Sequence, residues 1–534
     1  MTEPLSPQAL RTALDTDDPL ALLDVRDSLD YVEGHIPDCT FVPRRDLERR
    51  LPALVPNRAT PIVLCDRRGD RAPRDARWLT ELGYEDVSFL DGGVEAWSEA
   101  GFDLVEAVGH VHATALNYTS KRFGERVAAE RDLPTIGPSE LADLRDGADP
   151  LVIDVRNPEE YRRWGTVPDA VNVEGVDLAL YAEELRDDDQ PIVVNCAGRT
   201  RSIIGTATLD ALGVSEVYEL ENGTMGWQLA GHDLADGPGR PAERAPDTER
   251  VARLRESAEA LLDDAGVSRL PPADVAALPE SVPPTQSVSV IDVRREAEYD
   301  AGHLPDAISV PGGQLIQTAE AHLAVRDAEI VLVSETHVRS AITAYWLAEM
   351  GFARVSVLDG GIEAWTDDGR PLVESSDASE RIDADLVDER VACVGPSTLA
   401  ERLEREAVTV VDVDDSEAFV DAHVPGARWT SRYDLDADLE AGRIETDDPI
   451  VLSCRDGTRS ASAAAAVDAA VEGLDVAALR GGVDAWREAG FATDDGEEGM
   501  VRAPRRAERK PYGQGRAEMR QYLDWEEHLV EGSE

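Results

Sequence analysis

Basic residues are scarce in this sequence, and lysine is almost absent. Of 534 residues, 53 are Lys or Arg and 108 are Asp or Glu, which gives a formal net charge of −55. The lysines are Lys121 and Lys510 alone. A surface this acidic repels nucleic-acid phosphates and anionic lipid headgroups, so we expect neither a nucleic acid nor a membrane as a partner. The composition is typical of the cytosol of an extreme halophile, where high salt screens self-repulsion.

Paired cysteines and long apolar segments are also lacking. The five cysteines stand singly, without a Cys-x2-Cys pair, at Cys39, Cys65, Cys196, Cys393 and Cys454. This pattern argues against a zinc site and against a secreted disulfide framework, so we expect no metal and no cofactor. No apolar run approaches the roughly 18 residues that span a bilayer, and the N-terminus has no basic and apolar leader. The sequence therefore predicts a cytoplasmic protein.

A short apolar run that ends in Asp-Val occurs four times along the chain. The aspartates are Asp24, Asp154, Asp292 and Asp412. A second apolar run follows each of them and ends at Cys65, Cys196, Ser334 and Cys454, 41 residues on in the first case and 42 in the others. A tryptophan comes 31 or 32 residues later, at Trp97, Trp227, Trp365 and Trp486. An aspartate, a loop residue and a tryptophan that recur four times at nearly constant spacing indicate four tandem repeats.

Within each repeat, β-branched runs alternate with stretches of helical periodicity. Residues 192–194 have the composition of a fully buried strand, and Ile342, Tyr345, Trp346 and Met350 fall on one helical face. The alternation predicts α/β domains, each a mainly parallel sheet flanked by helices. We expect domain 1 at residues 1–107, domain 2 at 133–235, domain 3 at 268–375 and domain 4 at 391–495. A C-terminal tail of residues 496–534 follows, with an Arg-rich patch that would tether it to the acidic body.

Two loops between a buried strand and a helix carry the strongest chemical signal. One is Cys196-Ala-Gly-Arg-Thr-Arg201, and Cys454-Arg-Asp-Gly-Thr-Arg459 repeats its pattern. A six-residue loop at a helix N-terminus can turn its backbone amides toward a common centre and cradle an anion. Such surroundings can lower a cysteine pKa from about 8.5 to roughly 3.5–7.5, and the thiolate is the nucleophile. One cysteine per loop suits a bound sulfane sulfur better than dithiol redox chemistry.

The combination of Asp-Val-Arg, Gly-His-Ile/Leu-Pro, Cys-x4-Arg and Gly-Gly-x3-Trp resembles the rhodanese superfamily, and its arrangement resembles multi-domain rhodanese-related sulfurtransferases. The resemblance implies four tandem rhodanese-like domains and transfer of sulfane sulfur. A loop thiolate would attack the outer sulfur of thiosulfate or a similar donor and release sulfite. The resulting persulfide would pass its sulfur to cyanide or a thiol, including the thiol of an acceptor protein. The implied catalytic residues are Cys196, Cys454 and Cys65, and the implied anion-binding residues are Arg201, Arg459, Arg71, Gly198, Arg199, Thr200, Arg455, Gly457 and Thr458.

Two repeats depart from this pattern. In the third, Ser334 stands where the cysteine is expected, and a hydroxyl cannot carry a persulfide, so we expect a catalytically silent domain. The first reads Cys65-Asp-Arg-Arg-Gly-Asp-Arg71, with one extra residue between Cys and Arg. Such a Cys-x5-Arg loop resembles those of rhodanese-fold phosphatases and arsenate reductases, although Asp66 and Asp70 would disfavour an incoming phosphate. Oxyanion chemistry at Cys65 and a non-catalytic sulfur-relay or regulatory scaffold remain alternatives to sulfurtransfer.

A charged pair recurs four residues apart after three of the Asp-Val segments. Its members are Arg26 and Asp30, Arg156 and Glu160, and Arg294 and Glu298. In the fourth repeat both members are lost together, to Asp414 and Ala418. The joint loss predicts that the two side chains form an ion pair beside the loop.

Overall fold

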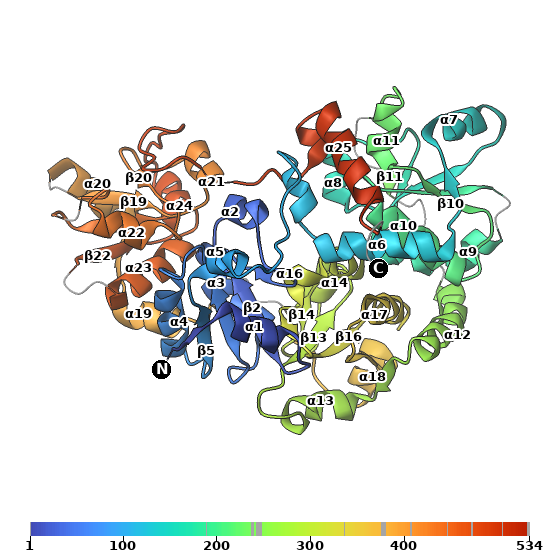
Figure 1. Cartoon of the computed structure of the whole chain (residues 1–534), viewed down its shortest axis with the longest axis horizontal. Helices are drawn as coiled ribbons and strands as arrows, with labels where there is room; N and C mark the ends of the chain where they lie inside the picture. Colours follow the sequence, from blue (N-terminus) through green and yellow to red (C-terminus); the bar gives the residue numbers. More distant parts are fainter. Residues whose placement is uncertain are drawn as a thin grey trace. The chain divides into compact units, whose positions relative to one another are not determined.

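The computed structural model describes residues 2–187, 190–235, 240–241, 248–335, 337–374, 381–405, 408–445, 447–470, 474–504 and 506–530 (Figure 1). Most of residues 236–247, in the connector after domain 2, lie outside these ranges. The chain divides into two compact units, Met1–Val105 with Asp377–Ala507 and Glu106–Ser376 with Glu508–Glu534. Domains 1 and 4, from opposite ends of the sequence, therefore share one unit. Domains 2 and 3 form the other, together with the end of the tail.

Each domain contains a parallel sheet whose strands follow the same spatial order. The order is β1-β5-β4-β2 with β3 on β2 in domain 1, and β11-β8-β7-β9-β10-β6 in domain 2. It is β12-β17-β16-β13-β14 in domain 3 and β18-β22-β21-β19-β20 in domain 4. The strands of domains 1 and 2 are β1 (Pro4–Leu5), β2 (Leu20–Asp24), β3 (Thr40–Phe41), β4 (Ile62–Cys65), β5 (Val87–Leu90), β6 (Thr135–Ile136), β7 (Leu151–Asp154), β8 (Val171–Asn172), β9 (Ile192–Asn195), β10 (Val217–Leu220) and β11 (Arg240–Pro241). Those of domains 3 and 4 are β12 (Ser268–Leu270), β13 (Val288–Asp292), β14 (Ile308–Ser309), β16 (Glu329–Val333), β17 (Val355–Leu358), β18 (Ala392–Val394), β19 (Thr409–Asp412), β20 (Arg428–Trp429), β21 (Ile450–Ser453) and β22 (Val476–Leu479).

Helices connect the strands. In and after domain 1 they are α1 (Pro7–Leu14), α2 (Ser28–Glu33), η1 (Arg44–Asp46), α3 (Leu47–Leu54), α4 (Ala72–Glu81), α5 (Gly93–Glu99), η2 (His112–Ala115) and α6 (Tyr118–Arg131). In and after domain 2 they are α7 (Pro138–Gly147), α8 (Pro158–Trp164), η3 (Gly175–Tyr181), α9 (Ala182–Arg186), α10 (Thr200–Ala211), α11 (Gly223–Leu229) and α12 (Thr248–Asp264). In and after domain 3 they are α13 (Pro272–Ser281), α14 (Glu296–Asp300), α15 (Gly312–Gln317), α16 (Ala319–His322), α17 (Val338–Met350), α18 (Gly361–Asp367) and α19 (Ala384–Arg390). In domain 4 and the tail they are α20 (Pro396–Arg405), α21 (Ser416–Asp421), α22 (Leu435–Glu440), α23 (Thr458–Ala470), α24 (Gly482–Glu488), η4 (Pro511–Gly513) and α25 (Arg516–Glu527).

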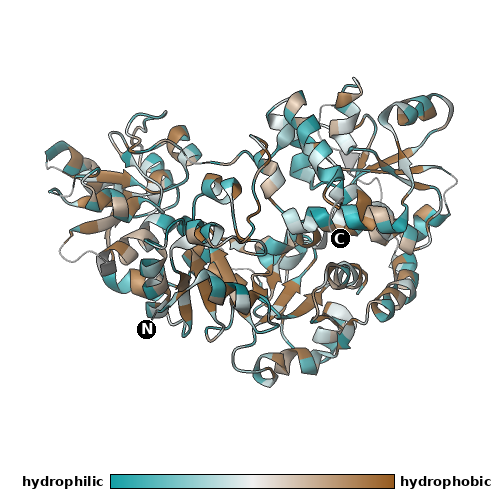
Figure 2. Cartoon of the chain, in the orientation of Figure 1, coloured by the Kyte–Doolittle hydropathy of each residue, from teal (hydrophilic) through white to brown (hydrophobic). Residues whose placement is uncertain are grey.

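The central strands and one face of each long helix supply the cores. All four residues of β9 are buried, as their β-branched composition predicts for a strand covered on both faces. Hydrophobic colour is concentrated on the central strands in Figure 2. On α17, Ile342 and Trp346 are fully buried, and the indole nitrogen of Trp346 donates a 2.9 Å hydrogen bond to Thr208 on α10. Domains 2 and 3 therefore share a continuous apolar core.

The predicted fold class is confirmed, since four parallel sheets are flanked by helices. Within the part of the chain that the structure describes, no helix is both long and apolar enough to cross a membrane.

Candidate active site

Cys196 follows the buried strand β9 directly, and helix α10 begins four residues later at Thr200. Its side chain is 2% exposed. The sulfur lies 3.4 Å from the hydroxyl oxygen of Ser202, and the backbone amides of Gly198 and Ser202 lower the pKa of the thiol. The loop therefore curls around the sulfur at a helix N-terminus, as the sequence predicts for an anion cradle.

The ionisation of Cys196 differs from the expectation of a lowered pKa. Burial raises the pKa of the Cys196 thiol, and the positive charge of Arg201 and the donors from Ser202 and Gly198 oppose this only in part. Desolvation penalises the thiolate more than the cradle stabilises it. Formation of the thiolate consequently needs a group that accepts the proton of the thiol.

Arg201 lies at the end of the loop, and its charge is matched by a two-point ion pair. Its Nη1 and Nη2 each lie 2.9 Å from an oxygen of Glu160 on α8. Although burial raises the pKa of the Glu160 carboxyl, Arg201 outweighs this effect and holds that pKa well below its usual range. The predicted pair between Glu160 and Arg156 is wrong, because Arg156 instead binds Asp154 through Nη2 at 2.7 Å. The two residues four apart thus belong to separate ion pairs. Arg156 pairs with Asp154 at the end of β7, and Glu160 pairs with the loop arginine Arg201.

Cys454 occupies the equivalent loop of domain 4. Its sulfur accepts from the Ser460 amide at 3.3 Å and lies 3.4 Å from the Ser460 hydroxyl. Burial raises the pKa of the Cys454 thiol, the Ser460 donors lower it, and Asp414 and Asp412 raise it, so that together they place the pKa at about 12. Asp414 stands where domain 2 has Arg156, so the fourth domain places a carboxylate near its loop cysteine. Cys454 is therefore harder to ionise than a thiol without a nearby carboxylate.

In domain 1 the cysteine predicted for the loop lies on the strand instead. Cys65 is the last residue of β4 and pairs with Asp24, just as Asn195 pairs with Asp154 and Ser453 with Asp412. The residue in the loop position of Cys196 and Cys454 is Asp66, so the loop is Asp-x4-Arg and contains no extra residue. The constant spacing of 42 residues from the Asp-Val aspartate already points to Asp66.

The Asp66 carboxylate fills the cradle of domain 1 from within. It accepts from the amides of Arg71 at 2.6 Å and Ala72 at 2.7 Å, and from the amide of Gly69. These are the donors that would otherwise hold an incoming anion. Cys65 is fully buried on the strand side, where burial raises the pKa of its thiol well above the usual value. Neither a persulfide at Cys65 nor oxyanion chemistry in this loop is supported by that arrangement.

A cavity of about 250 Å³ adjoins the domain 1 loop, between domains 1 and 4. Its lining includes the arginines Arg67, Arg68, Arg71 and Arg502. Each of them is already ion-paired, to Glu95, Glu95, Asp434 and Asp438 respectively. The positive charges of the arginines that line the cavity are therefore neutralised by carboxylates of the protein itself.

In domain 3 the hydroxyl of Ser334 occupies the cradle. It accepts from the Ser340 amide at 3.2 Å and lies 3.0 Å from the Ser340 hydroxyl. His337 in the same loop has a positive φ of 72°, a conformation that Gly457 adopts in domain 4. Domain 3 thus keeps the loop geometry without a thiol.

In the unit of domains 1 and 4, the loop arginine of each domain forms an ion pair with a carboxylate of the other domain. Asp434 of domain 4 binds Arg71 of domain 1 at 2.7 Å, and Asp46 of domain 1 binds Arg459 of domain 4 at 3.0 Å. These carboxylates occupy equivalent positions. The Val42 amide donates to the Asp24 carbonyl and the Thr430 amide donates to the Asp412 carbonyl, and each carboxylate lies four residues after that amide. In the other unit, Asp177 of domain 2 binds Arg339 of domain 3 at 3.1 Å.

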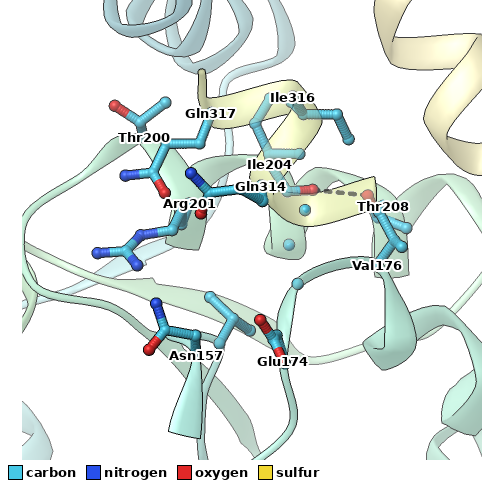
Figure 3. Close-up of a pocket in the computed structure, with 14 residues that line it drawn as sticks. Asn157, Glu174, Val176, Thr200, Arg201, Ile204, Thr208, Gln314, Ile316 and Gln317 are labelled. Carbon is cyan, nitrogen blue, oxygen red and sulfur yellow. Dashed lines mark hydrogen bonds between the residues drawn. The ribbon is translucent and has the colours of Figure 1, made fainter. Parts of the chain in front are cut away.

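The fourth member of this set is Gln314 on α15, which faces the Cys196 loop of domain 2. Gln314 is equivalent to Asp177. The Gly312 amide donates to the Val293 carbonyl as the Gly175 amide donates to the Val155 carbonyl, and each residue lies two positions after its glycine. Gln314 and Arg201 line one cavity of about 40 Å³, room for a few water molecules. Figure 3 shows Gln314 and Gln317 on one side of it, with Asn157 and Glu174 opposite. The neighbouring domain therefore places a neutral amide across the cavity from Arg201, whereas it places a carboxylate on each of the other three loop arginines.

The remaining residues of the two loops are held by protein partners. Arg199 binds Glu125 at 2.7 and 2.9 Å, and Thr200 donates to Glu526 at 2.9 Å. In domain 4, Thr458 donates to Asp456 through its amide and its hydroxyl. The Arg455 amide donates to Asp414 at 2.8 Å. Gly198 and Gly457 complete the turns, Gly457 with a positive φ of 84°.

The tail contributes side chains to the domain 2 site that sequence reasoning did not assign. Tyr512 donates to Glu160 at 2.9 Å, and the Lys510 ammonium lies 3.4 Å from the same carboxylate. On α25, Tyr522 is buried beside Gly198 and Met225, and Glu526 is buried against Thr200. The scarcity of lysine was a usable signal, since both lysines of the chain lie near this site: Lys510 at Glu160, and Lys121 beside Tyr522 and Trp525.

A sequence model described as the Rhodanese-like domain matches residues 6–100, 137–230, 272–368 and 395–489, which together make up more than half of the chain. The chain belongs to the rhodanese family. Its four rhodanese domains coincide with the four parallel sheets and their loops.

Several of the proteins that the chain is similar to are sulfurtransferases by name. A thiosulfate sulfurtransferase of Azotobacter vinelandii is 28% identical over 237 residues, covering 37% of this chain and 84% of the relative. A sulfurtransferase of Allochromatium vinosum is 32% identical over 100 residues, covering 19% of this chain and 92% of the relative. The crystal structure of a thiosulfate sulfurtransferase from Pseudomonas aeruginosa superposes with a TM-score of 0.87 at 37% identity. That match covers 99% of this chain and 97% of the other.

Proposed function

We propose that this protein is a sulfurtransferase that carries sulfane sulfur as a persulfide on Cys196, with Cys454 as a second carrier. The observation that carries the proposal is the buried Cys196 sulfur at the start of a six-residue loop, 3.4 Å from the Ser202 hydroxyl, where Arg201 and the loop amides favour its charged form. The similarity to thiosulfate sulfurtransferases of related sequence and fold supports the same class of reaction.

The thiolate attacks the outer sulfur of thiosulfate or a similar anionic donor. A sulfur–sulfur bond forms to Cys196, the sulfur–sulfur bond of the donor breaks, and sulfite leaves with the electron pair. Cyanide or a thiolate then attacks the terminal sulfur of the persulfide, and the Cys196 thiolate is regenerated. Arg201 and the loop amides stabilise negative charge on the donor during the first step.

Intact-mass measurement after incubation with thiosulfate tests the proposal. Each persulfide adds one sulfur atom, about 32 Da, so we expect up to two additions in the native chain. Cys196→Ser and Cys454→Ser should each remove one addition, and cyanide should restore the original mass with release of thiocyanate. Absence of both the mass gain and the thiocyanate would refute the proposal.

A further inference from the structure

A buried glutamate lies behind the Cys196 loop. Glu219 is on β10, the strand next to β9, and is 2% exposed. Its Oε1 lies 3.3 Å from the Ser202 hydroxyl, which in turn lies 3.4 Å from the Cys196 sulfur. The three side chains form a continuous line from the nucleophile into the protein.

This carboxyl is peculiar to domain 2. Glu219 is the last-but-one residue of β10 and pairs with a residue of the neighbouring central strand β9. The last-but-one residues of β5, β17 and β22 pair with their central strands in the same register, so the counterparts of Glu219 are Phe89, Val357 and Ala478. Burying a carboxyl costs several kcal/mol unless it is paired or protonated. An acid in a position that is otherwise apolar therefore calls for a role specific to this loop.

We propose that Glu219 is a positioning residue that accepts the proton of the Cys196 thiol through Ser202. The inference rests on the proposed function and names the group that activates its nucleophile. The thiol proton passes to the Ser202 oxygen while the hydroxyl hydrogen of Ser202 passes to Glu219. The sulfur is left as thiolate, the hydroxyl is unchanged, and the carboxyl is neutral. To do so the hydroxyl turns its hydrogen away from the Arg199 carbonyl, to which it donates at 2.8 Å.

The charges around Glu219 favour this exchange. Burial raises its pKa to about 8, with Arg199 and Ser202 opposing and Glu125 and Glu526 adding to the effect. Those groups come from the loop, α10, α6 and α25, and Lys121 on α6 approaches Glu526. Burial also raises the pKa of the Cys196 thiol, so the proton passes between two groups whose pKa values are both raised.

The pH profile of persulfide formation tests the assignment. The rate of sulfite release is measured in a Cys454→Ser background, so that Cys196 is the reporting loop. Glu219→Gln keeps the shape and removes the base. At pH 9, above the Glu219 pKa of about 8, the rate should therefore fall by about 10-fold or more, and the profile should move to higher pH. Ser202→Ala should do the same, and the double variant should add little because both changes interrupt one path.

The sign of the shift separates a proton acceptor from a merely electrostatic neighbour. If Glu219 acted only through its negative charge, its removal would favour the thiolate and move the profile to lower pH. That result, or an unchanged profile, would overturn the inference. Tyr218→Phe, on the opposite face of the same strand, is the matched control and should leave the profile in place.

The behaviour of Cys454 distinguishes failure of this inference from failure of the proposed function. In a Cys196→Ser background, Glu219→Gln should leave persulfide formation at Cys454 unchanged. If the native chain forms no persulfide at all, the sulfurtransferase proposal fails. If persulfide forms but the Glu219 and Ser202 variants behave as the native chain does, only the proton path is wrong. Thermal unfolding of each variant confirms that it is folded.

Discussion

Glu160 holds Arg201 by two parallel hydrogen bonds of 2.9 Å, so the arginine of the Cys196 loop has a fixed orientation before any donor binds. A two-point pair of this kind sets the plane of the guanidinium as well as its position. The pair is nearly buried, with side chains 13% and 7% exposed. Lys510 and Tyr512 of the tail contact the same carboxylate, so Glu160 binds both the tail and the loop arginine.

Replacing Glu160 with Gln should destabilise the fold in a pH-dependent way. Removing one partner of a buried pair costs about 3–5 kcal/mol. Because the pKa of Glu160 is depressed in the folded state, this stability is present above the unfolded pKa and is lost as the pH falls through the folded value. Urea unfolding should therefore show a large difference from the native chain at pH 7 that shrinks below about pH 4.5. Glu159→Gln, at the exposed neighbour, is the control; a gap that stays constant with pH would contradict the assignment.

Cys196 and Cys454 should differ in the pH at which they react. Burial and the nearby Asp414 and Asp412 carboxylates hold the pKa of Cys454 at about 12 despite the Ser460 donors. For Cys196, Arg201 opposes the effect of burial. The thiolate fraction rises with pH, so persulfide formation at Cys454 should require the higher pH. Sulfite release from Cys454→Ser and Cys196→Ser measures the two loops separately, and coincident profiles would count against this reading.

Cys65→Ser should leave both sulfur additions and the rate of transfer unchanged. The side chain lies on the strand side of the loop, and the Asp66 carboxylate occupies the cradle. Intact mass and thiocyanate release check the outcome, with Cys196→Ser as the variant that loses one addition. Loss of an addition in the Cys65 variant would show that domain 1 can carry sulfur after all.

Gln314→Asp should weaken the binding of an anionic donor at domain 2. The new carboxylate would face Arg201 across the shared cavity, as Asp177 already faces Arg339. We expect the KM for thiosulfate to rise by roughly 10-fold, about 1.4 kcal/mol, with a smaller change in kcat. Gln314→Asn keeps the site neutral and serves as the control. A KM that rises equally in both variants would indicate a packing effect instead of a charge effect.

Much of the fold was predictable from the sequence because its signals are local. Each Asp-Val run, loop and tryptophan recurs at a nearly constant spacing, and β-branched runs such as residues 192–194 mark buried strands. The strand–helix alternation and the four parallel sheets follow from these patterns. The expected silence of domain 3 likewise needs only the identity of Ser334.

The site was predicted less completely, since several of its relationships join residues far apart in the chain. Glu160 was expected to bind Arg156, yet it binds Arg201, 41 residues on. The cysteine landmark favours Cys65 as the loop residue, whereas strand register assigns that place to Asp66. Glu219 and Tyr512 belong to no sequence motif, so nothing local in the sequence marks them as site residues.

By itself, the sequence determined the four repeats, the α/β class and the two Cys-x4-Arg loops, because periodicity and loop chemistry depend on neighbours along the chain. Only the tertiary structure decided which domains share a unit, which carboxylate meets each loop arginine and which thiol is surrounded by amides. Those outcomes depend on burial and on the distances between charges from separate elements. Such distances exist only after the strands have paired and the helices have packed.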